Sequence, residues 1–289
     1  MIDAVAVTLP GGIFWEGELR RDATLRQVTG ADEDFLNEAC RSMSPAARTT
    51  ALLARCLRSL GPCAPVTSQA VRSLAAGDRE ALLLHLRRLT LGDQITCALT
   101  CPRADCAERM DLEIAVSDLL LEPYPSWDAR HEVLLDGTDQ SSRVRFRLAN
   151  GADQEAVAAL ARQDEDAAAA LLLDRCIEGV AGEAEPAAKM LAPTDRETLS
   201  RLMAELDPQA EVRLELTCPA CGVRFTALLD TASYFFQELA GRPEYLYREV
   251  HGLALHYHWS EAEILALSRR KRRLYLGLLA EALGGGGDG

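Results

Sequence analysis

The sequence predicts an α+β fold made of duplicated units, each a helix followed by a strand, a cysteine knuckle and a second strand. Segments 78–102 and 195–219 lie 117 positions apart and are identical at nine of twenty-five positions. Each segment leads into a cysteine pair: Cys101 with Cys106, and Cys218 with Cys221. Alanine and leucine dominate the chain while aromatic residues make up only 5%, which favours helices.

The pattern divides the 289 residues into five segments, and the 48% hydrophobic content is enough for a buried core. The segments are an N-terminal β segment (1–30), a helical region with the first repeat (31–128), a hairpin with Ala-rich helices and the second repeat (129–240), a C-terminal helical docking segment (241–283), and a glycine-rich tail (284–289) expected to be disordered.

Alternating residues 2–9, interrupted at Pro10-Gly11-Gly12, predict a strand or hairpin near the N-terminus. A helix with an acidic start is expected over 31–43. Ser44 is a favourable N-cap and Pro45 a favourable first helical residue, so a second helix is expected to reach about Gly61.

In the first repeat, Gly77-Asp78 is expected to cap a helix with a leucine stripe, and Gly92-Asp93 to turn into a strand at 94–100. The return strand is expected at 109–114, before a short helix starting at Ser117 or Asp118.

The second half is expected to follow the same order after a hairpin of 131–135 and 143–148 around Asp136-Gly137. Residues 152–177 are Ala-rich and predict two helical pieces, followed by a loop from 179 to 193. Two capping boxes are predicted, Thr194 with Glu197 and Ser260 with Glu263, the latter opening a helix over 261–283.

The two knuckles predict one structural zinc site. Four thiolates make a tetrahedral site, and each repeat supplies two of them: Cys101, Cys106, Cys218 and Cys221. Such a site would join two halves of the fold into a shared zinc-ribbon-like core, and its binding energy would become folding energy. Four sulfurs also leave no coordination position for a catalytic water.

Two other interpretations of the cysteines stay open at this level. One is a set of small buried thiols without metal. The other is a redox pair at Cys218 and Cys221, although redox pairs usually open a helix that stabilises the thiolate. Cys97 aligns with Leu214 in the repeat and is interpreted as a core residue. The remaining cysteines, at 40, 56, 63 and 176, have no paired spacing.

A partner-binding surface is predicted near the C-terminus. The candidate residues are His256, His258, Trp259, Arg269, Arg270, Lys271, Arg272 and Arg273. The five consecutive cations are typical of a solvated helix face or a docking surface for an acidic protein. Nucleic-acid binding is the alternative, which the lack of interleaved aromatic residues disfavours.

Bulk properties narrow the function classes. The net charge of -13 opposes nonspecific binding to nucleic acid or anionic membranes. The sequence has no apolar run long enough to span a membrane, and no signal peptide is visible. Unpaired thiols are typical of a cytoplasmic protein, which is the expected location. Motifs of serine hydrolases, P-loop proteins, zinc proteases and dinucleotide-binding proteins are missing, so we expect neither an enzyme nor a small-molecule substrate.

The order of these motifs resembles the baseplate proteins of T-even-type contractile phage tails and phage-tail-like contractile injection systems. The stretches that carry the resemblance are LTLGDQITCALTCPRADC, LTCPACG and EVHGLALHYHWSEAEILALSRRKRRLYLGLL, within a region from about Leu19 to Leu283. The first knuckle departs from the pattern, because four residues separate its cysteines instead of two. The resemblance implies a non-enzymatic protein that acts in the cytoplasm, either as a baseplate component incorporated into the particle or as an assembly factor. It also implies other baseplate or tail proteins as partners.

Overall fold

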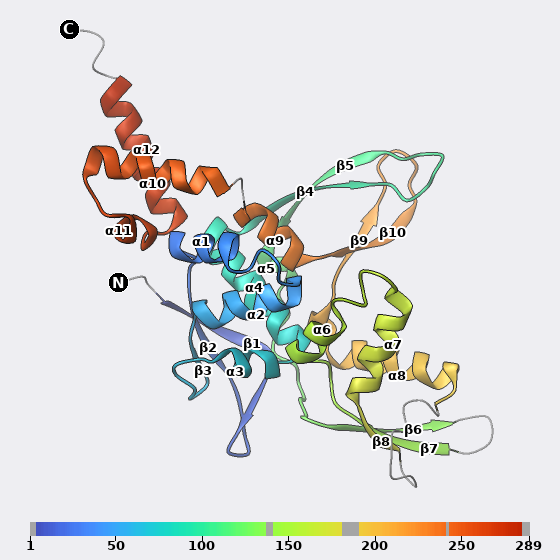
Figure 1. Ribbon diagram of the computed structural model, residues 1–289. Helices are drawn as coiled ribbons and strands as arrows, with labels where there is room; N and C mark the ends of the chain where they lie inside the picture. Colours follow the sequence, from blue (N-terminus) through green and yellow to red (C-terminus); the bar gives the residue numbers. More distant parts are fainter. Residues whose placement is uncertain (1–3, 137–140, 181–190, 241–242, 285–289) are drawn as a thin grey trace.

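The chain folds as two copies of one series of elements, followed by three C-terminal helices (Figure 1). A computed structural model describes residues 4–136, 141–180, 191–240 and 243–284. Each copy opens with a three-stranded antiparallel sheet in sequential order, β1-β2-β3 and β6-β7-β8, and later forms a two-stranded hairpin, β4-β5 and β9-β10. The mixed helix and strand content matches the α+β prediction.

The first copy begins at the N-terminus and surrounds helix α4. Its elements are β1 (Ala4–Trp15), β2 (Glu18–Arg26), α1 (Gly30–Glu38), α2 (Pro45–Cys56), β3 (Leu57–Leu60), α3 (Ser68–Ser73), α4 (Ala76–Leu91), β4 (Gln94–Thr100), β5 (Arg109–Ala115) and α5 (Val116–Leu119).

The second copy follows this order, except that α8 and the 3-10 helix η2 stand where the first copy has α3 and α4, and the C-terminal helices come after it. Its elements are β6 (His131–Asp136), β7 (Ser141–Phe146), α6 (Gly151–Val157), α7 (Glu165–Cys176), β8 (Ile177–Val180), α8 (Pro193–Leu206), η2 (Pro208–Ala210), β9 (Val212–Thr217), β10 (Arg224–Leu229) and α9 (Thr231–Ala240). The C-terminal helices are α10 (Pro243–Tyr257), α11 (Glu261–Leu265) and α12 (Arg269–Gly284).

A buried aspartate marks the same point of each copy. In the first copy Asp32 accepts hydrogen bonds from Arg26 Nη2 at 3.0 Å and from Arg55 Nε at 2.9 Å. Asp153 accepts the same two bonds, at the same two distances, from Arg147 and Arg175. Both aspartates occupy the N3 position of a capping box, at the start of α1 and of α6.

In each copy, the first arginine also donates a hydrogen bond to the backbone carbonyl of the second. Arg26 Nη2 donates to the Arg55 carbonyl at 2.8 Å, and Arg147 Nη2 donates to the Arg175 carbonyl at 2.9 Å. The duplication therefore extends upstream of the segments that the sequence comparison detected.

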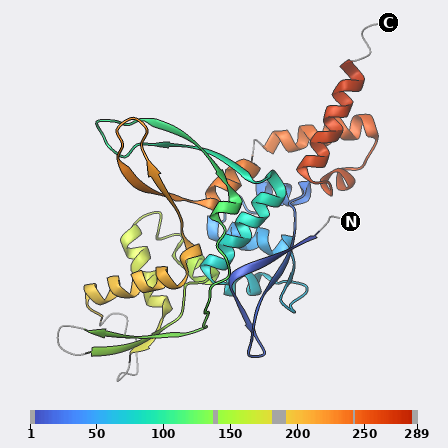
Figure 2. The same ribbon diagram turned by 180° about the vertical axis from the view of Figure 1, so that it is seen from behind.

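The main core lies around α4, which packs against β1 and α9. Leu82, Leu83 and Leu86 are buried there together with Phe235 of α9. A second cluster joins the bases of the two knuckle hairpins, through Ile95 and Val212. The hairpins extend from this base as an arm directed away from α12 (Figures 1 and 2).

Two predicted helix starts are wrong. Helix α4 begins after Ala75, and the Asp78 carboxylate instead accepts the backbone N–H groups of Gly11 and Gly12 at 2.9 and 2.8 Å. Helix α8 begins after Ala192 with Pro193 in its first turn, and no side-chain hydrogen bond caps it, so Thr194 is not its N-cap.

Other boundaries differ where strand pairing or a turn intervenes. The helix after Ser44 ends at Cys56, because residues 57–60 form β3 and pair with β2. Residues 261–283 form two helices, although the Ser260–Glu263 capping box is confirmed. The tip of the Asp136-Gly137 turn and the tail from 285 lie outside the described residues. Among the described helices, none has both the length and the apolar character needed to cross a membrane.

Candidate metal centre

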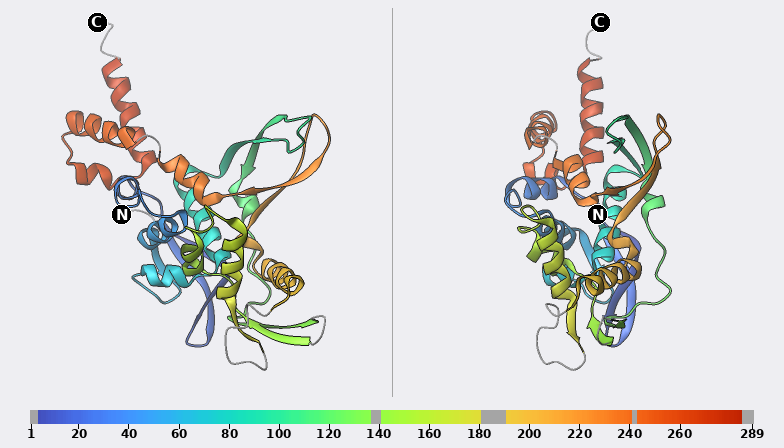
Figure 3. Two further views of the ribbon diagram at one scale, coloured as in Figure 1. Left: turned by 45° about the vertical axis from the view of Figure 1, so that its right-hand side comes forward. Right: turned by 90° about the vertical axis from the view of Figure 1, so that its right-hand side faces the viewer.

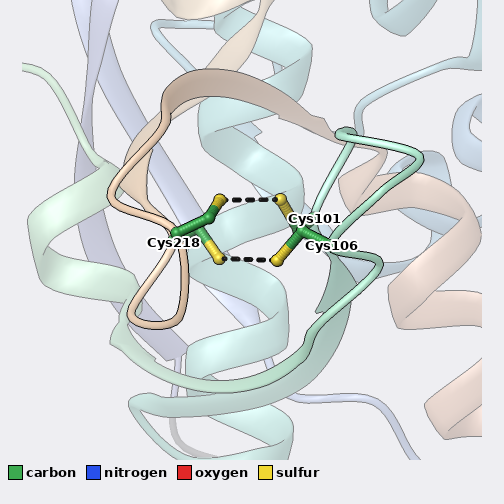
Figure 4. Close-up of side chains that lie close together, drawn as sticks. Cys101, Cys106 and Cys218 are labelled. Carbon is green, nitrogen blue, oxygen red and sulfur yellow. Dashed lines mark hydrogen bonds between the residues drawn. The ribbon is translucent and has the colours of Figure 1, made fainter.

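The two knuckles meet at the tip of the arm, although they belong to different copies and to separate two-stranded sheets. β4 and β5 pair from Gln94–Ala115 to Thr100–Arg109, and β9 and β10 from Val212–Leu229 to Thr217–Arg224. Each cysteine pair lies in the turn just beyond the last of these strand pairs. In Figure 4 the sulfurs of one knuckle face those of the other.

The sulfur positions fit a tetrahedral metal site. The Sγ atoms of Cys101 and Cys221 lie 3.7 Å apart, as do those of Cys106 and Cys218. All four sulfurs lie within 4.8 Å of one another. Zinc–sulfur bonds of ~2.3 Å in a regular tetrahedron place neighbouring sulfurs about 3.8 Å apart. A disulfide would bring two of them to about 2.05 Å, so these cysteines are not paired covalently.

Both turns shape the backbone in the same way despite their different lengths. The Cys101 N–H donates to the Glu108 carbonyl at 2.8 Å, and the Cys218 N–H donates to the Val223 carbonyl at 2.9 Å. The residue after the second cysteine is left-handed in each turn, with φ +46° at Ala107 and +70° at Gly222. The two extra residues of the first knuckle are therefore accommodated before Cys106.

Because only glycine adopts this conformation without strain, we expect Ala107→Gly to stabilise the protein and Gly222→Ala to destabilise it, each by about 1 kcal/mol. No atom lies within 4 Å of a Cβ placed at Gly222, so the second effect comes from the backbone and not from a clash. Chemical denaturation of the two variants measures both changes. Equal stability of wild type and Ala107→Gly would contradict the left-handed turn.

The environment of the sulfurs is largely apolar. Cys101 and Cys218 are buried, and Met110, Val223 and Phe225 pack around the four thiols. Hydrogen bonds from the backbone N–H groups of Cys221 and Ala220 lower the pKa of Cys218 to about 7, whereas desolvation raises the pKa of Cys101 to about 12. The two backbone hydrogen bonds thus favour the thiolate form of Cys218.

The other cysteines lie elsewhere. Cys97 is half-buried in β4, and Cys40, Cys56 and Cys176 are buried in the helical parts of the two copies. Burial raises the pKa of Cys56 to about 12 and that of Cys176 to about 11. Within the described ranges, the four knuckle cysteines are the one group of three or more His, Cys, Asp or Glu side chains arranged for a metal.

The C-terminal candidate residues are not part of the cysteine cluster. Arg272 is fully buried and pairs with Glu33 at 2.9 Å and Glu249 at 2.8 Å. Arg269 is half-buried and donates to the Glu238 carbonyl at 2.7 Å. The exposed residues of this set are His256, His258, Arg270, Lys271 and Arg273. Trp259 is half-buried and stacks on Tyr257, so two of the five cations and the tryptophan support the fold itself.

Sequence reasoning missed the two buried aspartates. The signal that marks them is the shared Gly-Ala-Asp at 30–32 and 151–153, each preceded by an arginine and followed by an Arg-Cys pair.

The comparison with protein families agrees with the family that the order of the motifs resembles. The family model described as T4 bacteriophage base plate protein matches residues 18–237, which is most of the chain. Neither the search of curated proteins nor that of solved structures finds a significant match. The match runs from β2 of the first copy into α9 of the second and includes all four knuckle cysteines, and the chain belongs to the T4 bacteriophage base plate protein family.

Proposed function

We propose that this protein is a non-enzymatic structural or assembly component of the baseplate of a contractile phage tail-like particle, and that a structural zinc ion holds its two copies together. Its partners are other baseplate or tail proteins, and it acts in the cytoplasm where the particle assembles. The family match over residues 18–237 is the observation that carries this proposal.

The metal centre supports a structural role. Cys101, Cys106, Cys218 and Cys221 would hold the ion, one pair from each copy, as two halves of a zinc ribbon. Soft thiolate ligands in a tetrahedral arrangement favour zinc over magnesium or calcium. The bound ion would cross-link the arm, and its binding energy would stabilise the fold.

A nucleic-acid-binding role through residues 269–273 has less support. Arg272 has no exposed surface, and Arg269 is engaged with Glu238. The three remaining cations stand on a chain of net charge -13, which repels a polyanion.

Deleting the gene from its producing strain tests the proposal. We expect particles without baseplates or with aberrant ones in electron micrographs, together with separate sheaths and tubes. Complementation with the Cys97→Ser variant should restore normal particles, whereas Cys218→Ser should restore few. Normal baseplates in the deletion strain would refute the assignment.

A further inference from the structure

Helices α11 and α12 repeat the design of α3 and α4. The same 193 positions separate the N-cap Thr67 from the N-cap Ser260, and the buried Arg79 from the buried Arg272. Each helix pair contacts a glycine that is the first residue of another helix, Gly151 of α6 or Gly30 of α1. The Gly151 N–H donates to the Leu74 carbonyl at 3.2 Å, and the Gly30 N–H donates to the Leu267 carbonyl at 3.1 Å.

The docked arginines confirm this equivalence. A Cβ at Gly151 would collide with the Arg79 guanidinium, and a Cβ at Gly30 would lie 2.8 Å from Nη1 of Arg272. The C-terminal helices therefore occupy on α1 the position that α3 and α4 occupy on α6. Each residue of α12 therefore has a counterpart in α4, 193 positions earlier.

Helix α12 has an exposed face where the matching face of α4 is covered. Ala81 of α4 is 1% exposed because β1 and α9 enclose the helix, but its counterpart Leu274 is 60% exposed. Leu278, the counterpart of the half-buried His85, is 48% exposed. Figure 3 shows that α12 extends out of the body in both views.

The residues along this face form a self-complementary stripe. Lys271, Leu274, Leu278 and Glu281 follow one another at spacings of three, four and three, and all four are exposed. This is the spacing of a helix–helix seam. Gly277 lies beside the seam with no atom within 4 Å of its would-be Cβ, which allows a second backbone to approach.

We propose that this face binds the α12 helix of a second copy of the chain, antiparallel and related by a two-fold axis level with residue 276. Antiparallel pairing sets Leu274 opposite Leu278 of the second copy. It sets Lys271 opposite Glu281, and the two-fold axis generates each contact twice. A parallel arrangement would place like charges together and is disfavoured.

The expected interface is small. The stripe from Lys271 to Glu281 spans about 15 Å of helix. The area that it buries on pairing is therefore at the low end for specific protein interfaces. The acidic bodies, each with net charge -13, also repel one another. The dimer should therefore be weak in dilute solution and should strengthen at the high local concentration of an assembled particle.

Sedimentation equilibrium of the full-length chain over increasing concentration tests this pairing. Wild type should form a reversible dimer, and Leu274→Glu with Leu278→Glu should remain monomeric. Lys271→Glu alone should weaken dimerisation by about tenfold, because two opposite-charge contacts become like-charge contacts. Glu281→Lys alone should do the same.

The decisive result comes from combining the two charge variants. A mixture of Lys271→Glu and Glu281→Lys chains should form a one-to-one heterodimer, and the double variant in one chain should dimerise like wild type. Arg201→Glu, on the exposed surface of α8, is the matched charge control and should leave dimerisation unchanged. A monomeric wild type, or a mixture no more associated than its components, would overturn the proposal and leave an acidic partner protein as the occupant.

Discussion

Replacing Cys218 by serine is expected to abolish stoichiometric zinc binding and to cost on the order of 5 kcal/mol of folding free energy. Cys106 and Cys218 belong to different copies and are more than a hundred residues apart in the sequence. In the chain-entropy model, a cross-link that closes a loop of this length contributes about 5 kcal/mol to stability. Loss of one ligand also leaves three thiols without the ion that holds them together.

The expected consequence is local separation of the two hairpins. Limited proteolysis should cut the Cys218→Ser variant in the turns at 101–106 and 218–222, while the core around α4 stays protected. Cys97→Ser, in the opposite hairpin β4-β5 and outside the cluster, is the control and should keep its zinc, its resistance to proteolysis and its thermal midpoint. A Cys218→Ser variant with unchanged zinc content and unchanged resistance to proteolysis would contradict the proposal that a zinc ion joins the two hairpins.

The second large effect is expected from the buried aspartates. Asp32→Asn and Asp153→Asn should each destabilise the protein by about 3–5 kcal/mol, because each leaves two arginines around a site that lacks its negative charge. Denaturant titration measures the change. The exposed Asp22→Asn is the matched control and should cost less than about 0.5 kcal/mol.

The two carboxylates are also expected to make stability fall at acid pH, because both have a lowered pKa in the folded protein. Burial alone would raise the pKa of Asp32, but hydrogen bonds from Arg26, Thr29 and Arg55 outweigh it and hold this pKa at about 2. Since the unfolded value is near 4, the contribution is fully present above about pH 4 and is lost as pH falls towards 2. Asp32→Asn should flatten the pH dependence in that window, and an unchanged slope would count against the buried pair.

The part of the fold near the cysteines was predictable because its sequence signals are local. The strand predicted over 94–100 is β4, and the return strand predicted over 109–114 is β5 with one further residue. Alternation and turn residues define these hairpins without help from distant parts of the chain. The grouping of all four sulfurs was predictable because each repeat supplies two cysteines and a tetrahedral zinc ion has four ligands.

Elsewhere, distant partners decided the outcome. Asp78 resembled a helix cap, but it binds Gly11 and Gly12 of β1, more than sixty residues away. Arg272 stood in a run of cations typical of a solvated face, but Glu33 and Glu249 neutralise it in the interior. Local sequence contains no record of such partners. The upstream half of the duplication has little sequence signal, because the two copies share only a few residues around Asp32 and Asp153.

The proposal that a zinc ion joins the two copies is tested most directly by zinc K-edge X-ray absorption of the full-length chain, combined with elemental analysis. The structure leads us to expect one zinc per chain with four sulfur neighbours at about 2.3 Å, and none in a chain lacking Cys101 and Cys218. A first shell containing nitrogen or oxygen, or a zinc-free protein with four readily titrated thiols, would contradict it.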